Sequence, residues 1–196
     1  MPEFTEFVKK NRPQKCGKPA SIIESESMLK RAVITGMGVV SPNGLGKNAF
    51  CRAVLDGKSG VKLITRFNTS DLPVKIAGEI QDFNEFDWIE ARERKHVSRS
   101  VPLAVAASAE ALQDAGLDPA GMSMAQKREI GVVLGTGGGA HDFSDAQYHM
   151  YYAGKVKQIS IFSIPSGTMG TMSSEISMRF GFRGLSHVVT DRKSVV

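Results

Sequence analysis

Two histidines and two aspartates lie close together in one short stretch of the sequence and could bind a metal ion: His141, Asp142, Asp145 and His149. His141 and Asp145 are four residues apart, which places them on one face of a helix. A metal site needs ligands that converge on one point, whereas His149 lies two helical turns from His141 and no second cluster supplies the missing ligands. We therefore expect the solvated, capped start of a helix here, and no metal.

Two glycine-rich turns could approach a phosphate group. Gly135-Thr136-Gly137-Gly138-Gly139-Ala140 fits the G-x-G-x-x-A pattern of dinucleotide-binding proteins. However, the acidic residue expected about twenty residues further on is replaced by the surroundings of Lys155 and Lys157. The other turn, Gly36-Met37-Gly38, lacks the third glycine, and Ser41-Pro42 would interrupt the helix that must face the pyrophosphate. We expect glycines that let backbone or ligand pass close to a strand end, and no cofactor.

The composition is that of an ordinary globular domain. Of 196 residues, 41% are apolar and 23% charged, and no apolar run is long enough to cross a bilayer. The net charge of +5 is too evenly spread to indicate a nucleic-acid partner. Two cysteines, Cys16 and Cys51, cannot form a disulfide framework or a four-thiolate metal site, which favours a reducing compartment and thus the cytoplasm.

Both ends of the sequence differ from the middle. Residues 1–27 are polar and aperiodic, so we expect a disordered leader or an over-extended start, with Met28 as the true first residue. Residues 191–196 put Asp-Arg-Lys directly after an apparent strand. The codons GAT CGG AAG AGC GTC GTG would encode them, and that string resembles the start of a common sequencing adapter. We therefore expect a non-native tail, which leaves 28–190 as the folded domain.

Apolar periodicity predicts alternating strands and helices along this domain. The patterns predict, in order, a buried strand over 32–36, a turn over 41–44, a helix over 47–55, a hairpin excursion over 61–83, a helix over 98–115 capped by Ser98 or Ser100, a strand over 130–135, helices over 141–152 and 165–180, and a buried strand over 186–190. The strand over 130–135 is apolar on both faces, which is typical of a central parallel strand covered by helices on two sides. The alternation indicates a layered α/β domain.

Several separate motifs, in order, resemble the β-ketoacyl-acyl carrier protein synthases, the condensing enzymes of the thiolase fold. They are the run from Arg31 to Gly44, the segment from Leu55 to Val61, the helix end from Gln113 to Leu117, the glycine loop from Gly135, and Gly181-Phe182-Arg183-Gly184 before a strand. The likeness spans about 29–190 and is strongest to synthase II, the elongating branch. It implies the N-terminal half of a duplicated, layered α/β/α fold.

The resemblance also implies that the catalytic nucleophile lies outside this domain. The family's cysteine stands at a helix N-terminus, one or two residues after the strand that corresponds to 186–190, where the helix favours the thiolate. The sequence diverges at Asp191, just before that position, and neither Cys16 nor Cys51 occupies it. The family's catalytic histidine pair belongs to the absent C-terminal half. We therefore assign no catalytic residue, expect the cysteine to follow Thr190, and expect this chain to be inactive alone.

Two peripheral roles follow from the resemblance. A basic stretch resembles the surface on which the acidic carrier protein docks: Arg92, Arg94, Lys95 and Arg99. The alternative is a solvated helix start, in which Glu93 balances the charge.

Gly137, Gly138 and Phe162 are candidates for the acyl pocket. Gly138 stands where the family often has a bulkier aliphatic side chain, so it either opens the pocket to longer chains or relieves strain in the loop. Phe162 resembles an aromatic segment that reaches toward the partner subunit of family dimers. The family more often has Pro-Phe-Phe there, and Leu185 stands where proline is usual, which indicates a divergent member.

The leading hypothesis is the N-terminal part of a synthase that condenses an acyl thioester with malonyl-acyl carrier protein in fatty-acid or polyketide synthesis. Its expected partners are acyl carrier protein, both thioester substrates and, at full length, a second copy. The alternative is a silent subunit, like a chain-length factor, in which another residue replaces the cysteine. A free-standing interaction module is disfavoured, because half a domain would leave the faces of its sheet exposed.

Overall fold

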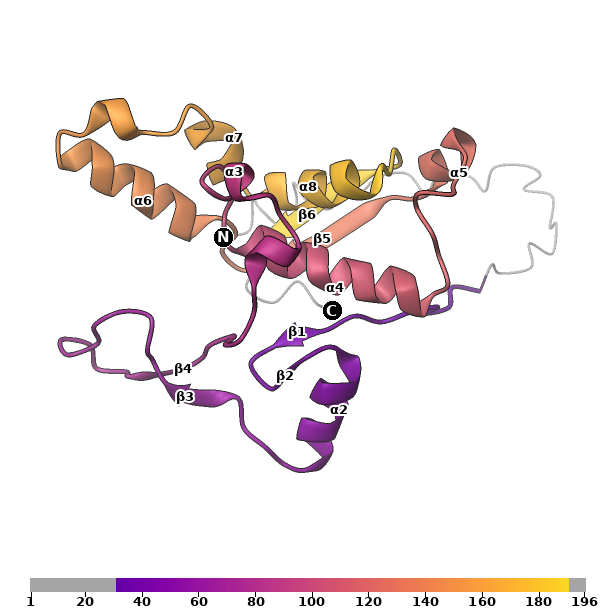
Figure 1. The fold of residues 1–196 in the computed structure, drawn as a ribbon, viewed down its shortest axis with the longest axis horizontal. Coiled ribbons are helices and arrows are strands. Elements are labelled where there is room, and N and C mark those ends of the chain that lie inside the picture. The colour runs from indigo at the N-terminus through magenta and orange to yellow at the C-terminus, as the bar shows by residue number, and fades with distance from the viewer. Residues whose placement is uncertain (1–30, 191–196) are drawn as a thin grey trace, which may run out of the picture. The chain divides into compact units, whose positions relative to one another are not determined.

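The computed structural model describes residues 31–190 (Figure 1). The expected leader over 1–27 and the expected tail over 191–196 lie outside the described residues. The elements below all belong to one compact unit that begins at Ile34. Among the described residues, no helix is both long and apolar enough to span a membrane.

The first half of the described chain holds two small antiparallel pairs and the longest of the described helices. Its elements are β1 (Val40–Ser41), β2 (Gly44–Leu45), α2 (Lys47–Leu55), β3 (Val61–Leu63), β4 (Ile76–Gly78), the 3-10 helix η1 (Glu85–Asp87), α3 (Ala91–Arg94) and α4 (Ser100–Asp114). The predicted turn and hairpin are confirmed, since β1 pairs with β2 and β3 with β4. The predicted α2 is confirmed to the residue, and Gly57 follows it with a φ of +66°.

The second half holds the parallel pair and the helices that lie against it. Its elements are α5 (Met124–Glu129), β5 (Val132–Thr136), α6 (His141–Tyr152), the 3-10 helix η2 (Val156–Gln158), α7 (Ser163–Gly167), α8 (Thr171–Phe180) and β6 (Ser186–Thr190). A capping box of Ser123 and Gln126 starts α5. The helix predicted over 165–180 is broken, because Thr168 is extended between α7 and α8.

The core lies where α4 crosses α8. Val101 and Val105 of α4 meet Met172 and Ile176 of α8, and all four are buried. The predicted N-cap of α4 is corrected: Arg99 occupies that position, although Ser98 Oγ still accepts the N–H of Ser100 at 3.2 Å. Gly116 ends the helix as expected, with a φ of +66°.

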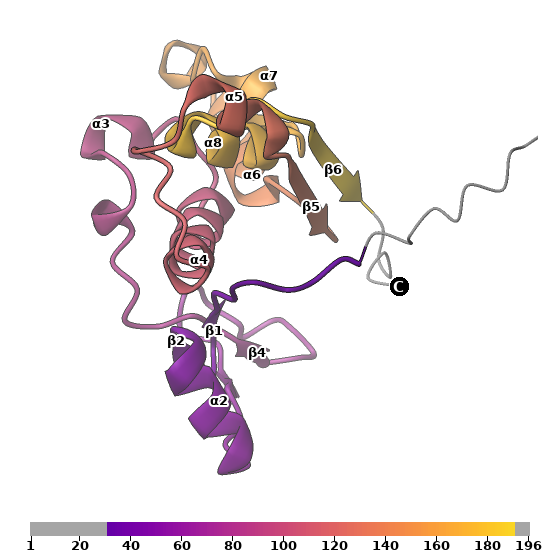
Figure 2. The same cartoon turned by 90° about the vertical axis from the view of Figure 1, so that its right-hand side faces the viewer.

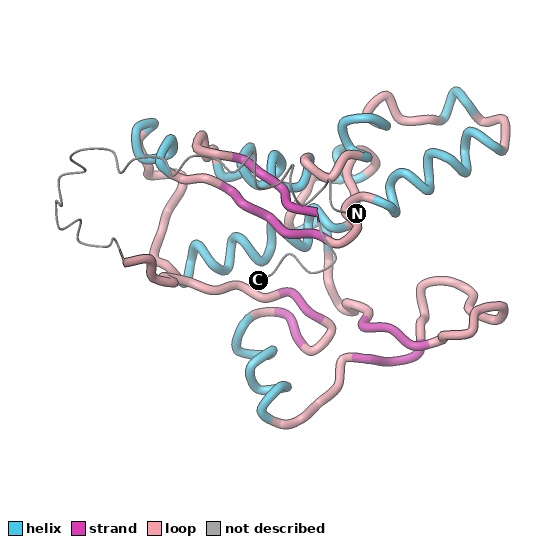
Figure 3. Tube along the Cα trace, turned by 180° about the vertical axis from the view of Figure 1, so that it is seen from behind, coloured by secondary structure: helices cyan, strands magenta, loops and turns pink. Residues whose placement is uncertain are grey.

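The parallel pair of β5 and β6 confirms the α/β class, but one of its faces is open. Figure 3 shows the two strands side by side, and Val132 pairs in register with Ser186. Val132 and Leu134 pack against the α4–α8 core, whereas Val133, on the opposite face, is 68% exposed. The prediction that helices cover both faces of this strand is therefore wrong for residues 31–190. The prediction that β6 is buried is also wrong, because four of its five residues are exposed.

The strand predicted over 32–36 does not form, because residues 31–39 pair with no other strand among those described. The backbone instead runs against α4. A Cβ at Gly38 would overlap the carbonyl oxygen of Ala107, and one at Gly36 that of Ala111. These two glycines therefore allow the backbone to pass close to another backbone, as expected, and that other backbone belongs to the helix α4.

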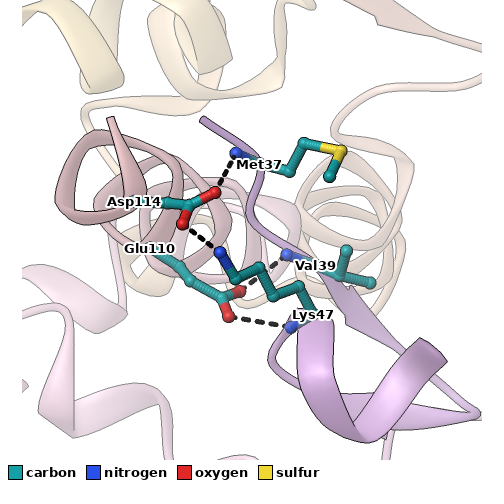
Figure 4. A network of polar contacts seen from close by, with 5 residues as sticks. All are labelled: Met37, Val39, Lys47, Glu110 and Asp114. Atoms are coloured by element: carbon teal, nitrogen blue, oxygen red, sulfur yellow. Dashed lines mark hydrogen bonds and ion pairs between the residues drawn. The ribbon is translucent and has the colours of Figure 1, made fainter. Parts of the chain in front are cut away.

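Two carboxylates of α4 hold this extended segment (Figure 4). Glu110 accepts the N–H of Val39 at 2.8 Å and that of Lys47, the first residue of α2, at 2.7 Å. Asp114 accepts the N–H of Met37 at 3.0 Å and pairs with the Lys47 ammonium group. The Lys47 contact and the Met37 N–H together lower the pKa of Asp114. One turn of α4 thus fixes both the segment and the start of α2.

Candidate functional site

Parallel pairing brings the glycine loop and the end of β6 to the same edge of the sheet. Thr136 of β5 lies opposite Thr190 of β6, the last residue described. The loop from Gly137 to Ala140 follows directly, and α6 begins after it. In open α/β sheets, ligands bind at the carboxyl ends of the strands. This edge is therefore where a site is expected.

An open hollow of about 890 Å³ lies beside β6 and α8, and we call it the β6 hollow. Its walls come from three segments. They include Phe162, Met169, Ser173, His187, Val188 and Thr190. Serine and threonine hydroxyls, one imidazole, the carboxylate of Glu175 and several apolar side chains line the hollow, and no cysteine lies among its described lining residues. These residues can bind an apolar chain with a polar end, but they offer no thiolate nucleophile.

The glycine loop closes on its own strand. Thr136 Oγ1 accepts the N–H of Gly139 at 3.0 Å and that of Gly138 at 3.4 Å. These two donors are therefore turned inward, away from any external phosphate. Gly139 has a φ of +65°, and a Cβ there would lie 2.6 Å from Cγ of Met169, a wall of the β6 hollow. The close approach of the Met169 side chain, together with the positive φ, explains why a glycine stands at position 139.

The acyl-pocket candidates fall in two places. Phe162 lines the β6 hollow and is 41% exposed. Gly137 has open space around the position of a Cβ, whereas a Cβ at Gly138 would lie 3.0 Å from Cδ2 of His141. A larger side chain at Gly138 would thus press on the start of α6.

The predicted histidine–aspartate helix exists but is joined to α4. Asp142 accepts the hydroxyl of Ser98 at 2.8 Å and the N–H of Arg99 at 2.9 Å, so it stabilises the start of α4. No side chain caps α6 itself, which corrects the expected capped start. His149 and Asp145 are largely exposed and 4.0 Å apart. Within residues 31–190 no three metal-ligating side chains gather around one point.

The predicted basic stretch divides into paired and outward-facing groups. Arg94 Nε lies 2.6 Å from Glu85 Oε1, and the Arg99 guanidinium donates to the carbonyl of Ile80 at 3.2 Å. Partial burial is the main cause of a lowered pKa at Arg99. Arg92 is 78% exposed beside Glu90, at 2.6 Å, and Lys95 is exposed.

A second hollow, of about 410 Å³, lies beside Arg179, and we call it the Arg179 hollow. The Arg179 guanidinium contacts Glu93 of α3 and Glu175 of α8, each at 3.1 Å. The walls of the Arg179 hollow also include His96, Val97, Phe162, Ser166 and Met178. Sequence reasoning missed this cluster. The spacing of Glu175 and Arg179 was the one available signal, because Glu93 lies 86 residues from Arg179.

The sequence model of the family described as Beta-ketoacyl synthase, N-terminal domain, matches residues 30–193. The chain belongs to the β-ketoacyl synthase family. Its α/β, thiolase-like fold class is confirmed by the solved structures of ketosynthases that it resembles. The match covers the glycine loop, both hollows and the basic stretch, so all of these belong to the ketoacyl synthase N-terminal domain.

Curated relatives come from two branches of the family. The chain is 36% identical over 169 residues to a 3-oxoacyl-[acyl-carrier-protein] synthase 2 of Rhizobium meliloti, covering 82% of this chain and 39% of the relative. It is 31% identical over 156 residues to the tetracenomycin polyketide synthase ketoacyl synthase beta subunit of Streptomyces glaucescens, covering 80% and 37%. A solved structure, the ishigamide ketosynthase/chain length factor, is 28% identical with a TM-score of 0.69, covering 81% of this chain and 39% of that one. The chain thus spans about two fifths of the length of these β-ketoacyl synthases.

Proposed function

We propose that the complete protein is a condensing enzyme that joins an acyl thioester to malonyl-acyl carrier protein. The observation that carries the proposal is the family match over 30–193, which extends past Thr190 and therefore past the β6 hollow. The name of one relative, 3-oxoacyl-[acyl-carrier-protein] synthase 2, gives its product as a 3-oxoacyl group on a carrier protein, which is the product that we propose here.

The chemistry divides into transfer and condensation. A cysteine thiolate after Thr190 would attack the acyl thioester and release the carrier thiol, with the acyl chain lying in the β6 hollow. Loss of CO2 from the malonyl group then leaves a carbanion. The carbanion attacks the acyl-enzyme, expels the thiolate and forms the β-ketoacyl thioester, while backbone N–H groups bind the oxyanion. No step needs a metal or a cofactor.

Resequencing the gene beyond the codon for Thr190 tests both the expected non-native tail and the nucleophile. A cysteine in place of Asp191 or Arg192 in the authentic gene supports the synthase, and its replacement by alanine should abolish condensation. The chain ending at Val196 should be inactive when assayed alone, because neither the nucleophile nor the histidine pair is present. Condensation by this 196-residue chain would refute the proposal.

The second candidate is a non-catalytic partner subunit like a chain-length factor. It is favoured by the likeness to a polyketide ketoacyl synthase beta subunit and to a ketosynthase/chain length factor. Glutamine or another residue in place of the cysteine would select this function. Such a protein should stimulate a competent partner while condensing nothing alone.

Docking of acyl carrier protein is proposed at the exposed part of the basic stretch. Lys95 is exposed, and Arg92 pairs with Glu90 but remains largely exposed, whereas the pair of Arg94 and Glu85 is mostly covered. Arg92 and Lys95 therefore offer the charges that an acidic partner can reach. Lys95→Glu should raise the KM for carrier-bound substrate, most strongly at low salt. Arg128→Glu, at an exposed basic residue in the last turn of α5, is the control. Equal salt profiles for the two variants would argue against docking at Lys95.

The proposal also includes a cytoplasmic homodimer. In support, β6 has an unpaired edge among the described strands, and such an edge invites a second strand. Sedimentation of the complete protein tests the dimer.

Gly138 is proposed to influence chain length. Gly138→Ile should shorten the products, since a Cβ there already lies 3.0 Å from Cδ2 of His141 and a longer side chain must extend elsewhere. Gly137→Ala, in open space, is the control. An unchanged product length in Gly138→Ile would refute this role.

A further inference from the structure

Phe162 lies between the two hollows. The β6 hollow and the Arg179 hollow share four lining residues: Phe162, Ser166, Glu175 and Met178. Phe162 is the largest of these side chains and comes from the segment before α7, whereas Glu175 and Met178 project from α8. A change in the position of the Phe162 ring would therefore alter the boundary between the two spaces.

The ring of Phe162 packs on His96, a residue to which the sequence assigned no role. The two ring centroids are 4.5 Å apart, and the ring planes are tilted by 57°. This separation lies within the range in which aromatic rings attract each other beyond simple burial. His96 comes from the segment between α3 and α4, so an element distant in sequence supports the ring.

A hydroxyl group links the same two residues through polar contacts. Ser160 Oγ accepts the N–H of Phe162 at 3.1 Å and lies 3.3 Å from Nδ1 of His96. The N–H of Ser160 donates to Oε1 of Gln147 on α6 at 2.8 Å. The backbone that carries Phe162 is thus attached to His96 on one side and to α6 on the other.

We propose that His96 is a positioning residue that holds Phe162 as a partition and thereby limits the length of acyl chain that the β6 hollow accepts. This inference rests on the proposed function, which places an acyl chain in the β6 hollow. On the Arg179 side of the partition Val97 adds apolar surface to that of Met178, which lines both hollows, and the charges of Glu93, Glu175 and Arg179 are paired. A chain that passes the partition would therefore gain burial in the Arg179 hollow.

The test measures binding of saturated fatty acids, from octanoic to octadecanoic, by displacement of cis-parinaric acid from the complete protein. His96→Ala and Phe162→Ala should both move the preferred length upward. Each methylene that becomes buried should tighten binding about fourfold, from ~0.8 kcal/mol per CH2. His96→Phe keeps a ring against Phe162 and should restore the wild-type preference. His149→Ala, an exposed histidine on α6, is the matched control and should match wild type.

The outcomes separate the partition from the proposed function. If Phe162→Ala leaves the preferred fatty-acid length unchanged, the partition is overturned. If Phe162→Ala changes the preferred length but His96→Ala does not, the role of His96 is overturned. Absence of fatty-acid binding in every protein overturns the partition, whereas the proposed function is judged by condensation alone. Length-dependent binding without any condensation refutes the proposed function and supports the partition. If His96→Ala does not fold, His96→Gln replaces it, because it also removes the ring that packs on Phe162, and a wild-type preference there overturns the role of His96.

Discussion

Replacement of Glu110 by alanine should release the extended segment around Val39 from α4. The carboxylate accepts two backbone N–H groups, at 2.8 Å from Val39 and 2.7 Å from Lys47. Hydrogen bonds to a charged group contribute about 1.5–3 kcal/mol each, and water can replace part of this at a half-buried site. We therefore expect local stability to fall by about 2–3 kcal/mol for the two bonds together.

Amide hydrogen exchange, followed residue by residue, measures this loss. A change of about 2–3 kcal/mol corresponds to a 30- to 140-fold faster exchange at Val39 and Lys47, at about 1.4 kcal/mol per tenfold. Glu129→Ala is the control, because Glu129 is an exposed glutamate at the end of α5. Exchange at Val39 and Lys47 within threefold of wild type in Glu110→Ala would refute the view that this carboxylate holds the segment.

Three further predictions concern stability. The pKa of Asp114 is lowered chiefly by Lys47, so this carboxylate stabilises the fold above its ordinary pKa, and that contribution is lost as the pH falls through the lowered value. In Asp114→Asn the free energy of unfolding should therefore fall less steeply than in wild type as the pH is lowered. The same acid dependence in both proteins would contradict the pairing. Gly38→Ala should lower the melting temperature sharply because its Cβ meets the backbone of α4, whereas Gly135→Ala has open space and should change it little; equal melting temperatures would contradict the close approach. Met172→Ala should cost about 2–5 kcal/mol in urea unfolding, since Met172 is 3% exposed in the core, and a loss below about 1 kcal/mol would show that the site collapses.

The open face of β5 bears on how the domain is completed. Val133 is 68% exposed although the strand is apolar on both faces. In Figure 2, the helices α4 and α8 both lie on one side of the strands β5 and β6. Because the chain spans about two fifths of its relatives' length, we infer that residues outside it cover this face in the complete protein.

The helix α2 and the turn between β1 and β2 followed from local sequence patterns. The apolar spacing from Lys47 to Leu55 and the glycine after it were sufficient to predict α2 exactly. The glycine loop after β5 was likewise predictable, because a buried strand followed by glycines marks a strand end. The ordered motifs from Arg31 to Gly184 were sufficient for the family resemblance, which the family match confirms.

The contacts that shape the site were decided by tertiary structure. Nothing near Phe162 in the sequence points to His96, which the fold brings to 4.5 Å between ring centroids. The segment over 32–36 has the apolar pattern of a strand, yet pairing depends on a partner strand. The α4 carboxylates instead hold the residues that follow it, Met37 and Val39. Local patterns report what a segment can form by itself. Which groups meet across the chain depends on the packing of α4, α8 and the parallel strands, and that packing is a property of the whole fold.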